Sequence, residues 1–166
     1  RSAMLIHWAD NFIVPGYAAL ETSLNALSVA TEDFVTGPSA TSLASARSSW
    51  LSAYQDFQVV SMFEIGRAAQ LNFRNRLNVY PTNTQALNSI VSSGVWDLEL
   101  PSNIDVQGFP ALDYLFYGLG TDEEIIAFFS AGDQAENYKL YVTSLVQTMR
   151  TLTAEVLSDW DNGYRE

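Results

Sequence analysis

The sequence predicts an all-α protein, an irregular up-down helical bundle with long first, second and last helices and a short buried helix near residues 110–119. Three observations predict this fold class. Apolar residues recur at helical spacing along three long segments. No segment shows the strict apolar–polar alternation of a half-buried strand. The 166 residues, 48% of them hydrophobic, are enough for a single domain, residues 1–166, with its own core.

A long first helix is predicted over residues 3–34. Pro15 and Gly16 interrupt it, and a kink is expected there because an internal proline removes a helical hydrogen bond. The turn at residues 36–39 (TGPS) ends the helix, since glycine favours helix ends and serine caps the next helix. The predicted apolar stripe consists of Leu5, Trp8, Phe12, Leu20, Leu24, Leu27 and Phe34.

A second long helix is predicted over residues 39–65, where Gly66 ends or bends it. Residues 67–81 are less regular. A short helix is expected over residues 82–93, capped by Thr82 and ended by Gly94, and residues 95–107 are predicted to form a loop. The apolar face of the second helix consists of Leu43, Ala46, Trp50, Tyr54, Phe57 and Val60.

The short helix that follows is predicted to be buried because it is apolar on all sides from Pro110 to Leu119. Pro110 suits the first helical position, where a missing N–H costs nothing. Thr121 caps a further helix with acidic residues in its first turn, where the helix dipole favours them. The last long helix begins at Asp133, and its apolar face consists of Tyr138, Tyr141, Leu145, Met149, Leu152, Val156 and Trp160.

Charge and composition exclude several classes of protein. The net charge is −11, and the basic cluster of Arg67, Arg74 and Arg76 is expected to be solvated, so no nucleic-acid partner is predicted. The absence of cysteine excludes disulfides and thiolate metal sites. No apolar run is long enough for a transmembrane segment. Because Arg1 is not a natural start, we expect a mature chain whose signal has been removed.

The common catalytic arrangements are missing from the sequence. His7 is the single histidine, and it is expected to cap or pack a helix rather than bind zinc. A serine nucleophile would lack a general base, and neither a nucleophile elbow nor a phosphate-binding glycine loop is present. No catalytic residue is therefore predicted.

Two isolated carboxylates, Glu64 and Asp113, stand out because each is the single charge within an apolar run. Such a carboxylate must be paired, hydrogen-bonded or protonated. If the two meet inside the bundle, they form a site for a hard cation or a proton-sharing pair. Alternatively, Asp113 interacts with a helix N-terminus or with Arg67, and Glu64 has a structural partner on a neighbouring helix. The aromatic residues around both are expected to belong to the core.

Four stretches resemble the imelysin-like family, also called peptidase family M75. They are NFIVPGYAAL (residues 11–20), ARSSWLSAYQDFQVVSMFEIG (residues 46–66), residues 78–118 from NVYPTN to DYLFYG, and the last helix ending in SDWDNGY. The resemblance extends over nearly the whole chain but corresponds to the N-terminal half of a family member. It implies an all-helical fold that continues into a second, related helical half.

The family motif Gly-x-His-x-x-Glu corresponds here to residues 108–113, GFPALD. Pro110 replaces the histidine and Asp113 replaces the glutamate, which weakens the metal role that the resemblance implies, because proline offers no side-chain ligand. Glu64 matches a second acidic position of the family. The resemblance also implies a periplasmic or outer-surface location, as a lipoprotein or secreted protein, and a link to iron uptake or regulation.

These observations lead to three hypotheses. The first is a cell-envelope protein that binds a ligand, or a metal such as iron or another divalent ion, near Glu64 and Asp113, with Arg67, Asp105 and Tyr117 as neighbours. The second is a metal-dependent peptidase or hydrolase of family M75. The third is a non-catalytic scaffold that docks a second helical half, in the same protein or in a separate chain. The identity of any cofactor is left open.

Overall fold

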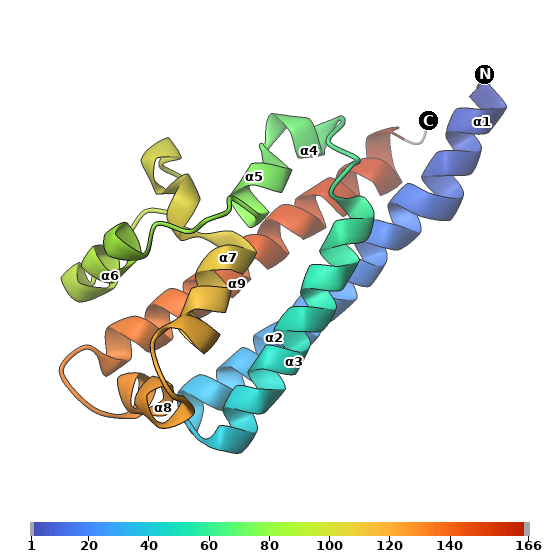
Figure 1. Ribbon diagram of the computed structural model, residues 1–166. Helices are drawn as coiled ribbons and strands as arrows, with labels where there is room; N and C mark the ends of the chain where they lie inside the picture. The colour runs from blue at the N-terminus through green and yellow to red at the C-terminus, as the bar shows by residue number, and fades with distance from the viewer. Residues whose placement is uncertain (1, 165–166) are drawn as a thin grey trace.

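The computed structural model describes residues 2–164, and all regular structure in that part of the chain is helical, which confirms the predicted all-α fold. Three long helical rods form the frame (Figure 1). The first rod joins α1, a π-helical segment η1 and α2 end to end. The second rod is α3, and the last rod joins α9 to a π-helical segment η4. The bounds of these elements are α1 Ser2–Trp8, η1 Ala9–Ile13, α2 Val14–Thr36, α3 Ala40–Val60, α9 Ala135–Asp159 and η4 Trp160–Tyr164.

Shorter helices connect α3 to α9 and cover one side of the frame (Figure 1). Among them, α7 lies between α3 and α9, and α6 lies further from the α2–α3 pair (Figure 1). Their bounds are α4 Arg67–Gln70, α5 Phe73–Leu77, α6 Thr84–Ser93, the 3₁₀ helix η2 Pro101–Val106, α7 Gly108–Asp113, the π-helical η3 Tyr114–Gly118, and α8 Asp122–Ser130.

Helix ends follow the predicted capping chemistry at two places. The Ser39 hydroxyl accepts a hydrogen bond from the Ser42 amide at 3.2 Å and begins α3. Thr121 and Glu124 form a reciprocal capping box at the start of α8. Each such cap contributes roughly 1 kcal/mol to stability because it satisfies amides that have no partner inside the helix. Gly94 ends α6 in a left-handed conformation, as predicted.

Two hydrogen bonds fix the chain at and just before the start of α7. On one side, the Trp50 indole of α3 donates a hydrogen bond to the Phe109 carbonyl at 3.1 Å. On the other side, the buried Tyr141 hydroxyl of α9 donates to the Val106 carbonyl at 2.6 Å. Between these two bonds, Phe109 is fully buried against α3 aromatics. The start of α7 is thus fixed to both long helices, and this position determines where the side chains at its end lie.

The first rod differs from its prediction in two respects. The irregularity is the π-helical segment at residues 9–13, directly before Pro15, where the Val14 amide donates to the Ala9 carbonyl. Leu5, Trp8 and Phe12 are 58%, 49% and 54% exposed, so this part of the predicted apolar stripe is not in the core. The reason is geometric, because α1 projects beyond the end of α3 (Figure 1).

The segment before α7 also differs from its prediction. Asn83, not Thr82, caps α6 and accepts from the Ala86 amide at 3.1 Å. The predicted loop at residues 95–107 contains η2, whose 3₁₀ geometry gives no 3.6-residue apolar period to detect.

The short helix α7 begins two residues earlier than predicted, so Pro110 is its third residue rather than its first. Its burial is incomplete, since Asp113, Tyr117 and Gly118 are exposed along α7 and η3.

Candidate functional site

A small open pocket lies where α3 and α7 meet the segment that follows α5. Its volume is about 120 Å³, and it contains both altered positions of the Gly-x-His-x-x-Glu pattern. Pro110 is buried and Asp113 is exposed. The lining residues are Trp50, Tyr54, Asn78, Tyr80, Phe109, Pro110 and Asp113. We refer to this site as the Asp113 pocket.

Aromatic rings form most of the Asp113 pocket. Trp50 and Tyr54 stack with ring centroids 5.4 Å apart and an interplanar angle of 8°. Tyr54 also meets Phe109 edge to face at 5.2 Å. The rings of α3 are one helical turn apart, which places them on the same face. Tyr80, which is 84% exposed, supplies a further ring from the segment after α5.

The Asp113 carboxylate has no hydrogen-bond or ion-pair partner among the described residues. Its surroundings are apolar and aromatic, and the loss of hydration there raises its pKa above the ordinary value of 3.8. One sequence interpretation expected a helix N-terminus or Arg67 to compensate this charge. Among the described residues, neither does. The pocket therefore has one uncompensated negative charge when Asp113 is ionised.

Tyr117 and Arg47 lie beside the Asp113 pocket. Asp113 is one of the groups that raise the pKa of Tyr117, after the larger effect of burial, so the two side chains are close. The Arg47 guanidinium lies 4.4 Å from the centroid of the Tyr117 ring. It donates to the Phe116 carbonyl and to Asp122, both at 2.8 Å. Arg47 is thus already paired, and Asp113 is left without a cation among the residues that the structure describes.

Glu64 lies in a different environment. Its carboxylate accepts the Arg74 backbone N–H, with N–O distances of 3.1 and 3.4 Å. Loss of hydration raises the pKa of Glu64, while the hydrogen bond from Arg74 and the charge of Arg74 oppose that rise. Neither Glu64 nor Asp113 is among the charges that shift the pKa of the other. The structure gives Glu64 the structural partner that the sequence interpretation offered as an alternative.

Arg67 and Asp105 also have partners outside the Asp113 pocket. Arg67 pairs with Glu155 at 3.3 Å and donates to Gln70 at 3.1 Å. The Asp105 carboxylate accepts from the Asn83 side chain at 3.3 Å, and its backbone carbonyl accepts from the Thr82 hydroxyl. Of the five residues proposed from the sequence, the structure places only Asp113 and Tyr117 near one another at this site.

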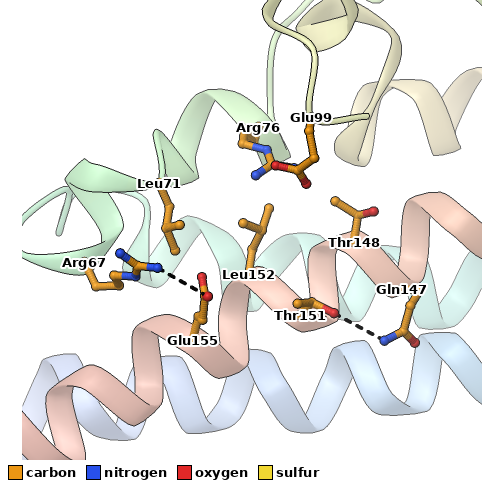
Figure 2. Close-up of a pocket in the computed structure, with 9 residues that line it drawn as sticks. All are labelled: Arg67, Leu71, Arg76, Glu99, Gln147, Thr148, Thr151, Leu152 and Glu155. Atoms are coloured by element: carbon orange, nitrogen blue, oxygen red, sulfur yellow. Dashed lines mark hydrogen bonds and ion pairs between the residues drawn. The ribbon is translucent and has the colours of Figure 1, made fainter. Parts of the chain in front are cut away.

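Arg67 lines a second, larger pocket of about 380 Å³ between α9 and the α4–α5 segment. Figure 2 shows two ion pairs in it, Arg67 with Glu155 and Arg76 with Glu99, with Leu152 between them. The Arg76–Glu99 distance is 2.6 Å. Since each arginine already faces a carboxylate, this pocket has no uncompensated charge to select a ligand. The three arginines likewise form no basic patch, because Arg74 lies beside Glu64.

No group of three or more potential metal ligands (His, Cys, Asp or Glu) comes together within the part of the chain that the structure describes. His7 lies on the exposed α1 and shares a hydrogen bond with Asn11. Within the same described residues, no helix has the length and apolar character needed to cross a bilayer.

Sequence reasoning missed several residues of the Asp113 pocket. Trp50 and Tyr54 follow the apolar period of α3, which predicts core positions, yet both are only partly buried. Asn78 and Tyr80 lie in a segment without periodicity, where no pattern marks them. The sequence does contain a signal for this pocket, which is the isolated charge of Asp113 together with the aromatic pair Trp50 and Tyr54, four residues apart on α3.

Comparisons with known proteins bear on the family and the fold of the chain. The Imelysin family (peptidase M75) matches residues 13–166. This chain belongs to the imelysin family. Its fold is similar to the crystal structure of a protein described as an iron-regulated protein A precursor from Parabacteroides distasonis, with a TM-score of 0.77 and 19% sequence identity. No curated protein sequence matches the chain significantly.

The imelysin-family chain spans less than half of that similar protein. The match covers 96% of this chain but 44% of the other. At 19% identity, the similarity shows a shared fold. The imelysin domain described above thus corresponds in length to one part of a larger relative.

Proposed function

We propose that this chain is a ligand-binding, non-catalytic half of an imelysin-family cell-envelope protein linked to iron uptake or its regulation. The observation that carries the proposal is the Asp113 pocket. The family motif falls in an open, aromatic-lined site where Pro110 supplies no ligating group and the Asp113 carboxylate has no partner within residues 2–164. A single carboxylate can attract and orient a ligand, whereas catalysis of hydrolysis needs further groups in reach.

The link to iron and to the envelope is supported by the similar structure. That protein is described as iron-regulated and as a precursor. A precursor form is usual for exported proteins, which lose a targeting segment. We extend both properties to this chain, with a periplasmic or outer-surface location as a lipoprotein or secreted protein.

A second helical half is the partner we propose, either in the same protein or as a separate chain. The share of the similar structure that this chain leaves unmatched supports this partner. The apolar side chains of Leu5, Trp8 and Phe12 offer a surface for it, since all three are about half exposed on one helical rod. Exposed apolar surface of this kind marks contact sites in soluble proteins.

The test compares the purified wild-type chain with Asp113→Ala in three measurements. These are bound iron and zinc after loading and dialysis, hydrolysis of an unfolded protein substrate with and without those metals, and abundance in cells grown with and without iron. We expect no metal-dependent hydrolysis and an abundance that responds to iron. Hydrolysis that requires both a metal and Asp113 would overturn the proposal in favour of the peptidase alternative. An abundance that ignores iron would contradict the iron link.

A further inference from the structure

The Asp113 pocket combines two features that favour the same kind of ligand. The first is the negative charge of Asp113, which has no partner among the described residues. A carboxylate that loses hydration without gaining a partner is unfavourable in the free protein, and an incoming positive charge would restore the lost interaction.

The second feature is the aromatic lining. Trp50, Tyr54, Tyr80 and Phe109 all line the pocket together with Asp113. The face of an aromatic ring carries partial negative charge, so a cation within about 6 Å of its centre is attracted. The neighbouring Arg47–Tyr117 contact, at 4.4 Å, already forms a pair of this kind within the chain.

Other ligand classes fit the pocket poorly. A metal ion needs several oxygen, nitrogen or sulfur ligands, and no cluster of three potential ligands occurs within the described residues. An anion would be repelled by Asp113, and the nearby Arg47 is held by Phe116 and Asp122. The volume of about 120 Å³ is below the roughly 300–1,000 Å³ of pockets for drug-sized molecules. A single small headgroup is the ligand that this volume and charge accommodate.

We propose that the Asp113 pocket binds a small organic cation, an ammonium or methylated ammonium group, held by the Asp113 carboxylate and by the rings of Trp50, Tyr54 and Tyr80. This inference rests on the proposed function only in taking the pocket as the ligand site. Pro110 contributes to this site because its ring is buried and uncharged. A histidine at this motif position would bring bound water and a metal-ligating nitrogen, and Pro110 brings neither.

The experiment titrates the purified chain with tetramethylammonium chloride at constant ionic strength and follows binding by calorimetry and by the NMR signals of the pocket residues. tert-Butanol, which has a similar shape and no charge, serves as the neutral probe. n-Butylammonium, an analogue of a lysine side chain, distinguishes a lysine-bearing partner from a free quaternary ligand. Sodium chloride at matched concentration controls for screening.

Three variants assign the binding to the pocket. Asp113→Asn keeps the shape and removes the charge, and we expect it to weaken binding at least tenfold. Tyr80→Leu removes an exposed ring without opening the core, and we expect a loss of about twofold to fivefold, the size of one exposed cation–π contact. The matched control is Asp133→Asn, which removes the same charge from an exposed loop outside the pocket and should leave binding unchanged.

The outcomes separate this inference from the proposed function. Binding of either organic cation that Asp113→Asn weakens and Asp133→Asn does not would support the inference. Equal binding of tert-butanol, equal effects of the two Asp→Asn changes, or no binding of any cation would overturn it. In each of those cases the iron response and the hydrolysis assay would still decide the proposed function. Stoichiometric iron or zinc that Asp113→Ala loses would also overturn the inference, while leaving a ligand-binding role intact.

Discussion

Glu64 and Asp113 look alike in the sequence but lie in contrasting environments in the fold. Each is an isolated carboxylate in an apolar run, and loss of hydration raises the pKa of both. Glu64 accepts a backbone N–H at the start of α5 and lies beside the positive charge of Arg74. Asp113 has aromatic neighbours and no partner among the described residues. The comparison separates a carboxylate that stabilises the fold from one that is free to contact a ligand.

Gly108 lies at the start of α7 against the end of α5, and its replacement should have the largest effect. Its φ of +74° suits glycine, and an added Cβ would collide with the Leu77 carbonyl at the end of α5. We expect Gly108→Ala to lower the free energy of unfolding by about 2–4 kcal/mol, because backbone strain and a clash with backbone add together. Chemical denaturation with urea measures the change.

The matched control for Gly108→Ala is Gly132→Ala. Gly132 also has a positive φ, of +94°, but an added Cβ there would meet no atom within 4 Å. The control should therefore show the cost of the conformation alone, about 1–2 kcal/mol. Equal losses in the two variants would mean that the close approach of Gly108 to the Leu77 backbone adds no cost to that of the conformation.

Removal of each carboxylate should affect stability differently. Glu64→Ala leaves the Arg74 amide without its acceptor, so we expect a loss of about 1 kcal/mol, the usual net value of such a hydrogen bond. Asp113→Ala removes no hydrogen bond that the described part of the chain makes, and its stability should stay within about 0.5 kcal/mol of wild type. Parallel urea denaturation of the two variants makes the comparison. A larger loss for Asp113→Ala would show that its carboxylate has a structural role.

The pH dependence of stability should reveal the same unpaired carboxylate. The folded-state pKa of Asp113 lies above its ordinary value of 3.8, so the folded protein binds more protons in that window than the unfolded chain. Stability from this group is then greatest below the ordinary pKa and decreases as pH rises through the raised value. Asp113→Asn should match wild type in acid and become the more stable protein as pH rises. A difference that does not vary with pH would contradict this assignment.

Acid should also release an organic cation from the Asp113 pocket. Protonation removes the charge that attracts the ligand, and the raised pKa of Asp113 moves this loss to a higher pH than for an aspartate with the ordinary pKa of 3.8. The neighbours of Asp113 with titratable groups are the phenols of Tyr54, Tyr80 and Tyr117, and none of these three is a carboxyl or imidazole group. Calorimetric titration with tetramethylammonium at several pH values measures the effect. Affinity that is constant through the acid range would mean that Asp113 is not the attracting group.

The smallest effect on stability is expected for Tyr80→Leu. Because Tyr80 is 84% exposed, its replacement should change the free energy of unfolding by less than about 0.5 kcal/mol. Thermal unfolding checks this value. A large loss of stability would place Tyr80 among the structural residues and would remove it from the proposed ligand site.

The long helices could be predicted from the sequence because burial imposes a period on them. Leu20, Leu24 and Leu27 lie on one face of α2, and all three are fully buried. Leu5 and Phe12 follow the same period but are exposed, because periodicity does not show where the neighbouring helices end. The helical fold was therefore predictable, while the extent of the core depended on tertiary packing.

Of the candidate site, the sequence indicates Asp113 but not the other residues that line the pocket. An isolated charge is visible in a sequence, but the partner of a charge is not, so Glu64 and Asp113 could not be distinguished. The partner of Glu64 is a backbone N–H, which every residue except proline offers. Asn78 and Tyr80 reach the pocket from a segment without periodicity, and their placement depends on the packing of α7 against α5.

The most direct measurement is an NMR titration of the side-chain carboxyl groups of Glu64 and Asp113 with and without tetramethylammonium. A cation that binds the ionised form must lower the pKa of the group it contacts, by thermodynamic linkage. The account predicts that tetramethylammonium lowers the pKa of Asp113 and leaves that of Glu64 unchanged. An unchanged Asp113, or equal shifts of both carboxyl groups, would contradict it.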